Sequence, residues 1–449
     1  MAKILLIYPQ PDEIKRARFG YSLTLLYSAS VLGEEHQCVY KDFSWERFER
    51  KDVAKLIDAI DLVIVECDSV TLKRSTNIHN GEQLIRAIKE VNPKLPIICV
   101  GKDIALFPRA ISGASVCCVG EPEKVIERVI KSLLNKDFEM LKHTTGLYVA
   151  ANGKVFCTGK AELIEDLDTL PFPCRTLLPK SLEFGVGYKS ALIETSRGCE
   201  ARCIFCQRRG WSEGRFRPHS VDYVLKEFDL LYKHGYKNIW ITDDNFSFHL
   251  SRAKQILALL GDRGLTKGMK IALSSWANVD KEFLQIAKYA GVSIVSFGVE
   301  SANKEILKFY KKHINLKTLK ELVEYADSLG LYCVGNFIIG APMESEKTIN
   351  ETFLFAEETP FDQVNVKILN YIAGSLLFEG LPSRFKNERT VFACKENGLN
   401  NFGLDDLKKK IWEFKKKFYD NRKMKITKKI SLHGPPFFEN LKGSSRYHR

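Results

Sequence analysis

Three cysteines stand within eight residues, at Cys199, Cys203 and Cys206, with the spacing C-x3-C-x2-C. A structural zinc site takes four ligands and disulfides use cysteines in pairs, so this set is one short for either. Three thiolates can hold three irons of a [4Fe–4S] cube and leave the fourth iron open. The spacing therefore predicts an iron–sulfur cluster, with zinc as the alternative if Cys174 or His219 supplies a fourth ligand.

The elements around the triplet predict a barrel of parallel strands over residues 186–380. Strands are expected at 191–195, 238–242, 270–274, 294–298, 332–339 and 363–369, with helices near 221–234, 251–260, 281–290, 316–328 and 346–358. Six such strand–helix units indicate a partial (β/α) barrel, whose chemistry lies on the loops that follow the strands. The triplet comes directly after the first strand, where a functional site is expected.

This triplet, with Phe205 just before its third cysteine, resembles the radical S-adenosylmethionine (SAM) superfamily. The resemblance implies that the amino and carboxylate groups of SAM bind the open iron. It also implies that reduction of the cluster cleaves SAM to methionine and a 5′-deoxyadenosyl radical. An electron donor of the flavodoxin or ferredoxin type is then expected.

Other motifs resemble SAM-binding stretches of the same superfamily. "ITDDNFSF" stands where relatives bind the methionine amino group, "SFGVESAN" where they meet the ribose, and "GNFIIGAPMES" beside the adenine. In "YIAGSLLF", Ala373 stands in the place of the usual proline-glycine-threonine turn. The resemblance implies SAM contacts at Phe205, Asp243, Asp244, Ser275, Glu300, Gly340 and Ala373. The alternatives are a helix cap for Asp244 and a salt-bridge partner for Glu300.

Residues 1–135 alternate short apolar strands with helices, as in "KILLIYP", "DLVIVECD" and "PIICVGK". This pattern predicts an α/β domain with a doubly wound parallel sheet, which binds ligands at the carboxyl ends of its strands. Residues 136–185 include the proline-rich "LPFPCRTLLP" and are expected to form an extended connector.

This first domain resembles the cobalamin-binding domain that precedes the barrel in one class of radical SAM enzymes. "YPQP", "IICVGKDIALFP" and "VGEPEKVI" carry the resemblance. It implies cobalamin contacts at Pro9, Leu72, Arg74, Gly101, Lys102, Gly120 and Glu121. The D-x-H-x-x-G motif is absent, because "FSWERF" follows Asp42. A purely structural first domain is the alternative.

The leading hypothesis is cobalamin-dependent methylation of an unactivated carbon. Relatives with the same layout also catalyse rearrangement, cyclisation or carbon–carbon coupling, on lipids or tetrapyrroles among others, so this alternative stays open. A methylthiotransferase is disfavoured because that family needs a further cysteine trio in its first domain. A non-catalytic metal module that binds RNA or a partner is the third hypothesis. The substrate, a small molecule, peptide or lipid, is not identified.

Of the net charge of +13, residues 405–449 carry +9, with fourteen Lys and Arg against five Asp and Glu. Within the basic region at 381–449, Leu407, Ile411, Phe414 and Phe418 are spaced as one face of a helix. A docked helix with a solvated basic face is expected, and a peripheral membrane contact is the alternative. Nucleic-acid binding is not expected, because no RNA-binding motif is present.

The chain contains no run of about 18 apolar residues, and its N-terminus becomes polar too early for a signal peptide. The nine cysteines outside the triplet are scattered, several of them within apolar runs such as "PIICVG" and "VCCVG". Such thiols are typical of buried side chains in a reducing compartment. We therefore expect a cytoplasmic protein.

Overall fold

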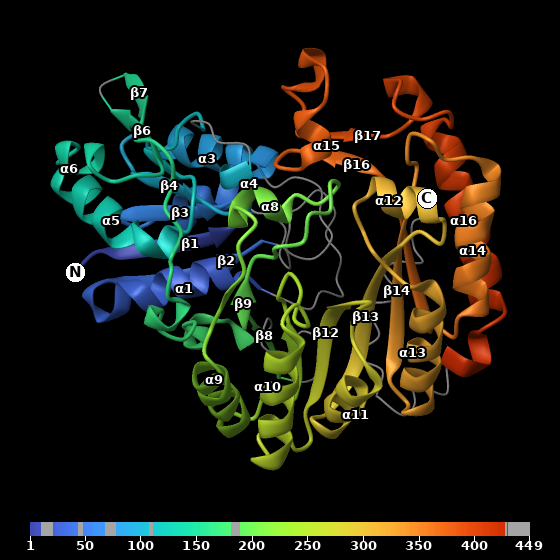
Figure 1. The fold of residues 1–449 in the computed structure, drawn as a ribbon. Coiled ribbons are helices and arrows are strands. Elements are labelled where there is room, and N and C mark those ends of the chain that lie inside the picture. Colours follow the sequence, from blue (N-terminus) through green and yellow to red (C-terminus); the bar gives the residue numbers. More distant parts are fainter. Residues whose placement is uncertain are drawn as a thin grey trace. The chain divides into compact units, whose positions relative to one another are not determined.

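The computed structural model describes residues 1–9, 21–43, 48–67, 78–106, 111–151, 153–180, 189–426 and 429. The chain divides between Ser190 and Ala191 into two compact units. Figure 1 shows the elements of each unit. This division differs from the predicted one, because residues 136–180 belong to the first unit.

The first unit contains a seven-stranded sheet with the order β2-β1-β3-β4-β5-β6-β7. Its strands are β1 (Lys3–Tyr8), β2 (Gln37–Asp42), β3 (Leu62–Glu66), β4 (Ile97–Val100), β5 (Val116–Cys118), β6 (Leu147–Ala151) and β7 (Lys154–Cys157). The first five pair in parallel, and β6 and β7 add an antiparallel edge. The predicted parallel sheet is thus confirmed, but part of the predicted connector is strand.

Helices of the first unit lie on both faces of this sheet (Figure 1). They are α1 (Leu23–Leu32), α2 (Val53–Leu56), α3 (Ile78–Val91), α4 (Lys102–Leu106), α5 (Ile126–Asn135) and α6 (Glu139–Lys142). All five residues of β3, "LVIVE", are buried, as expected for a central parallel strand covered on both faces.

The second unit contains a six-stranded sheet with the order β15-β14-β13-β12-β11-β8. Its strands are β8 (Ser190–Ile193), β11 (Asn238–Ile241), β12 (Lys270–Trp276), β13 (Val292–Glu300), β14 (Tyr332–Ile339) and β15 (Gln363–Ile368). From β11 to β15 every neighbouring pair is parallel. The predicted partial barrel is therefore confirmed, and all six strands overlap their predicted ranges.

Long helices connect these strands: α9 (Val221–Lys233), α10 (Leu250–Asp262), α11 (Lys281–Tyr289), α13 (Leu316–Ser328) and α14 (Glu346–Glu358). Their apolar residues share one core with alternate strand residues, such as Leu273, Val295 and Phe337. The residues between these strand positions consequently point to the opposite, inner face of the curved sheet.

The basic C-terminal region begins with α16 (Leu404–Asp420). Leu407, Phe414 and Phe418 are buried in the barrel core, and Ile411 packs against it. Phe414 stacks on Phe353 of α14 at 4.2 Å between ring centroids, and Figure 1 shows the two helices side by side. The predicted docked face is thus confirmed. Among the residues that the structure describes, no helix has the length and apolar character needed to cross a membrane.

Candidate functional site

The three cysteines lie on one loop between β9 (Ser196–Arg197) and α8 (Arg208–Ser212). Gly198 begins this loop with φ +86°. A Cβ atom at that position would lie 2.1 Å from the carbonyl oxygen of Arg215 and 2.6 Å from Cβ of Ser212. Only glycine allows both the backbone angle and this close approach, so Gly198 sets the path of the chain into Cys199.

Contacts with later parts of the barrel hold the middle of the loop. The backbone N–H of Ile204 donates to the carbonyl of Tyr310 at 3.3 Å, and the N–H of Leu377 donates to the carbonyl of Ile204 at 3.0 Å. Phe205 packs edge-to-face against Tyr310, with ring centroids 5.0 Å apart. Phe205 therefore braces the loop, and its predicted contact with SAM stays a prediction.

The thiols lie in a desolvated environment. Burial raises the pKa of Cys199 to about 11 and that of Cys203 to about 12. Burial also raises the pKa of Cys206, and the nearby Arg208 opposes this rise. The thiols are thus protonated at neutral pH in the absence of metal, and binding of iron must release their protons.

Two cations near the thiols are each paired with a carboxylate that follows a barrel strand. Nε of Arg208 lies 3.0 Å from Oδ1 of Asp244, and Nζ of Lys312 lies 2.6 Å from Oε1 of Glu300. Burial raises the pKa of each thiol, and Lys312 opposes this rise at Cys203 while Arg208 opposes it at Cys199 and Cys206. The salt-bridge alternative for Glu300 is therefore observed, and Asp244 also forms an ion pair.

The number of thiols favours a cluster over a single zinc ion, because the loop offers three cysteines and a structural zinc site takes four ligands. Zinc draws its ligands to within about 2.0–2.3 Å of one centre. A [4Fe–4S] cube instead takes each thiolate on a different iron. His219, one of the candidate fourth ligands, stacks on Tyr223 with ring centroids 3.9 Å apart.

Asp243 is buried and fastens the start of the cysteine loop. Its Oδ1 accepts the backbone N–H of Thr195, and its Oδ2 accepts the hydroxyls of Thr195 and Ser196, each at 2.6 Å. Burial raises the pKa of Asp243 to about 6, although these hydrogen bonds and Arg252 oppose the rise. The structure thus gives Asp243 a positioning role, and its contact with SAM stays a prediction.

The predicted SAM residues Ser275 and Glu300 also lie at strand ends. The hydroxyl oxygens of Ser275 and Ser247 are 2.6 Å apart, so the end of β12 is linked there to the loop that follows β11. Glu300 has φ +67°, a conformation that costs a non-glycine residue about 1–3 kcal/mol and that clusters at functional sites. A Cβ at Gly298 would lie 2.8 Å from the charged atoms of both Glu300 and Lys312, so this glycine makes room for their ion pair.

At the end of β14, Gly340 and Ala341 donate their backbone N–H groups to Oε2 of Glu344. Glu344 is buried, and burial raises its pKa to about 7 against these two hydrogen bonds. The N–H of Ala373 donates to the carbonyl of Arg389 at 2.9 Å, so this donor is already used within the chain. The predicted adenine contacts at Gly340 and Ala373 stay predictions.

Several buried polar atoms at the strand ends have no hydrogen-bond partner within the described part of the chain. They are Oε1 of Gln207, Nδ2 of Asn245, the hydroxyl of Tyr310, Oε1 of Glu344 and Oδ1 of Asn370. Gln207, Asn245 and Glu344 lie on segments that follow β9, β11 and β14, whereas Tyr310 follows α12 (Lys304–Phe309) and Asn370 begins β16 (Asn370–Ile372). Because unsatisfied buried polar atoms are costly, their concentration fits a site completed by a polar ligand such as SAM.

The sequence analysis missed four of these residues: Arg208, Tyr310, Lys312 and Glu344. Arg208 stands two positions after Cys206, a cation close enough in sequence to have been considered. Glu344 stands four positions after Gly340, within a quoted motif. Tyr310 and Lys312 carry no local signal, because their link to the cysteine loop spans about a hundred residues.

In the first unit, several predicted cobalamin residues have partners within the chain. A Cβ at Gly101 would lie 2.6 Å from the carbonyl oxygen of Cys67, and one at Gly120 would lie 2.5 Å from Cβ of Ala161. Oε2 of Glu121 accepts the N–H of Ile164 at 2.7 Å. These residues shape the ends of β4 and β5, and their cobalamin contacts stay predictions.

Two further predicted cobalamin residues are described. Pro9 is buried directly after β1, and Lys102 begins α4. Leu72 and Arg74 lie outside the described residues. The Asp42 carboxylate is buried and accepts the hydroxyl of Tyr40 at 3.2 Å, so it shapes the end of β2.

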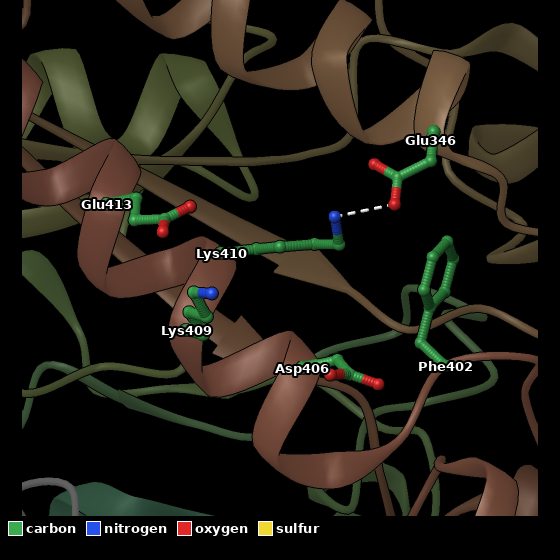
Figure 2. A pocket seen from close by; sticks show the side chains of 6 residues that line it. All are labelled: Glu346, Phe402, Asp406, Lys409, Lys410 and Glu413. Atoms are coloured by element: carbon green, nitrogen blue, oxygen red, sulfur yellow. Dashed lines mark ion pairs between the residues drawn. The ribbon is translucent and has the colours of Figure 1, made fainter.

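A pocket on the outside of the second unit is unrelated to the cysteine loop. Figure 2 shows its lining, in which Lys410 reaches Glu346 at 2.6 Å. The lining residues come from α16, the first turn of α14 and the segment between β17 (Thr390–Phe392) and α16: Glu346, Phe402, Asp406, Lys409, Lys410 and Glu413. The lining carries charges of both signs, and none of its residues is a predicted site residue.

Comparison with known proteins agrees with this geometry. Residues 193–356 match the family model of the radical SAM superfamily. The chain is 31% identical to the uncharacterised methyltransferase PH0819 of Pyrococcus horikoshii, over 84% of this chain and 82% of that protein. It is 30% identical to cytidylyl-2-hydroxyethylphosphonate methyltransferase of Streptomyces wedmorensis, over 80% of this chain and 74% of that protein.

Among solved structures, the fold resembles the radical SAM methyltransferase TsrM from Kitasatospora setae, determined with cobalamin and a [4Fe–4S] cluster bound. The TM-score is 0.70 at 16% identity, over 84% of this chain and 74% of that one. The two-unit architecture is therefore shared with that enzyme. The chain belongs to the radical SAM superfamily.

Proposed function

We propose that this enzyme uses a cobalamin cofactor to methylate an unactivated carbon of its substrate. The observation that carries the proposal is the cysteine loop at the carboxyl end of the barrel, together with buried polar atoms that lack partners within the described part of the chain. The two relatives described above, at 31% and 30% identity, are named methyltransferases, which favours methyl transfer over rearrangement or cyclisation.

In this proposal Cys199, Cys203 and Cys206 hold the cluster. With SAM and cobalamin bound, these cofactors supply a 5′-deoxyadenosyl radical and a transferable methyl group. Arg208 and Lys312 lie near the thiols and favour their anionic forms. The buried walls of the loop exclude water, which protects radical chemistry from side reactions.

The polar groups near the strand ends have the chemistry that the predicted SAM contacts need. Asn245 and Glu344 offer one unsatisfied donor and one unsatisfied acceptor near the ends of β11 and β14. Glu300, held by Lys312, can accept a hydrogen bond from a ribose hydroxyl. Asp243, just after β11, accepts the N–H of Thr195 and so holds the segment that leads into the cysteine loop.

The partners in this proposal are an electron donor of the flavodoxin or ferredoxin type and a substrate that reaches the barrel. The exposed lysines of α16, together with the partly exposed Trp412, are the surface for the predicted peripheral membrane contact. Flotation with anionic and neutral lipid vesicles tests that contact, because binding that does not depend on lipid charge contradicts it.

The proposed function is tested with anaerobically purified, iron-reconstituted protein incubated with cobalamin and then desalted. Retained cobalamin near one per chain, together with 5′-deoxyadenosine formed from SAM under reducing conditions, supports the proposal. Cleavage of SAM without retained cobalamin would assign a structural role to the first unit and exclude cobalamin-dependent methylation.

A further inference from the structure

Alternation along β15 places three polar residues on the inner face of the barrel. Val364 and Val366 pack into the helix-covered core, so the alternate residues Gln363, Asn365 and Lys367 face the opposite side. This polar run is unusual for a barrel interior, which branched apolar side chains generally fill. An interior surface of this kind is suited to contact a polar ligand.

Hydrogen bonds between side chains hold this inner face in one arrangement. Nδ2 of Asn365 donates to Oδ1 of Asn336 at 3.0 Å, and Nδ2 of Asn336 donates to Oγ of Ser296 at 2.8 Å. The amide ladder therefore connects β15, β14 and β13. In the parallel register, Lys367 lies beside Ile338, two residues from Asn365 toward the carboxyl end that carries the cysteine loop.

Among the described residues, Lys367 differs from Arg208 and Lys312 in having no carboxylate partner. Arg208 is paired with Asp244, and Lys312 with Glu300. Within the described part of the chain, Lys367 makes no ion pair or hydrogen bond. Its side chain is exposed to water, yet the surrounding protein lowers the pKa of its ammonium group, against the opposing effect of Glu300.

An ammonium group that faces the inner side of the barrel, is open to water and has no carboxylate partner in the described part of the chain is suited to bind an oxyanion of a ligand. In the proposed function the carboxylate of SAM binds the open iron of the cluster. Building on the proposed methyltransferase function, we propose that Lys367 binds an oxyanion of the methyl-accepting substrate, which is an anionic small molecule. The amide ladder forms the polar floor beside that group.

The test measures binding of three small aromatic probes to the cluster-loaded, SAM-bound enzyme by calorimetry. Phenyl phosphate and benzoate carry an oxyanion, and benzamide is a neutral counterpart of benzoate. The shared aromatic ring keeps the apolar part of the three probes constant, so they differ in their charged or polar group. One charge-assisted hydrogen bond corresponds to about a tenfold preference for the anionic probes.

Lys367→Met should remove the preference for anionic probes, and Lys367→Arg should retain most of it. Lys317→Met, which removes an exposed lysine of α13, is the matched control and should change nothing. The unfolding midpoint of Lys367→Met should not fall, because no ion pair is lost. Preference for phenyl phosphate alone would assign the site to phosphate esters, and preference for both anions to oxyanions in general.

Equal binding of all three probes to the wild-type enzyme would overturn the inference. So would a tenfold loss of SAM affinity in Lys367→Met with unchanged probe binding, since Lys367 would then serve SAM. Cobalamin retention and 5′-deoxyadenosine formation by the wild-type enzyme are measured separately. Failure of the proposed methyltransferase function is therefore distinguishable from failure of the anion site.

Discussion

Replacing Gly198 by alanine tests whether close packing at the start of the cysteine loop positions Cys199. The left-handed backbone costs an alanine about 1–2 kcal/mol. The new Cβ would lie 2.1 Å from the carbonyl oxygen of Arg215, so backbone must also move. Overpacking of this kind costs about 1–3 kcal/mol more. We therefore expect a loss of about 2–5 kcal/mol in the free energy of unfolding.

Gly235→Ala is the matched control, because Gly235 has φ +75° and no atom within 4 Å of an added Cβ. It should show only the backbone cost of about 1–2 kcal/mol. Urea unfolding of both variants measures the difference, and iron per chain after reconstitution reports the position of Cys199. Equal destabilisation of the two variants, or full iron loading of Gly198→Ala, would refute the reasoning.

Three further predictions concern the cysteine loop, a buried ion pair and a buried carboxylate. Cys203→Ala should lose most of the reconstituted iron. Cys333→Ala, which removes a buried barrel thiol outside the loop, should retain it, and equal iron contents would argue against the cluster assignment. Lys312→Met leaves Glu300 buried and unpaired, so urea unfolding should show a loss of about 3–5 kcal/mol in the free energy of unfolding. Adding Glu300→Gln should recover part of this loss, and no recovery would contradict the ion-pair argument. Burial raises the pKa of Glu344 from 4.5 to about 7 in the folded protein, so stability present at low pH is lost as pH rises from 4.5 through 7, by about 3 kcal/mol in total. Glu344→Gln should flatten this part of the stability curve, and an unchanged slope would show that another group causes it.

Periodicity and strand-end motifs predicted most of the second unit. The six barrel strands overlap their expected ranges because apolar residues run through each strand or, as in β15, alternate along it. The spacing of Leu407, Phe414 and Phe418 likewise predicted the buried face of α16. Strong local patterns of this kind survive into the tertiary structure.

The sequence was less informative where structure depends on distant partners. β6 and β7 lie within the predicted connector; both are short, and β7, at the edge of the sheet, is largely exposed. Asp243 was predicted to bind SAM, and the structure adds that its oxygens accept hydrogen bonds from Thr195 and Ser196, about fifty residues earlier. Sequence spacing places a carboxylate at a strand end but does not determine which donors occupy its oxygens.

The central claim is that the loop of Cys199, Cys203 and Cys206 holds a cluster whose open iron binds SAM. The most direct test incubates the reconstituted enzyme anaerobically with SAM and a strong reductant and measures 5′-deoxyadenosine. We predict its formation by the wild-type protein and its loss in Cys203→Ala. A wild-type protein that binds zinc at the loop and yields no 5′-deoxyadenosine would contradict the claim.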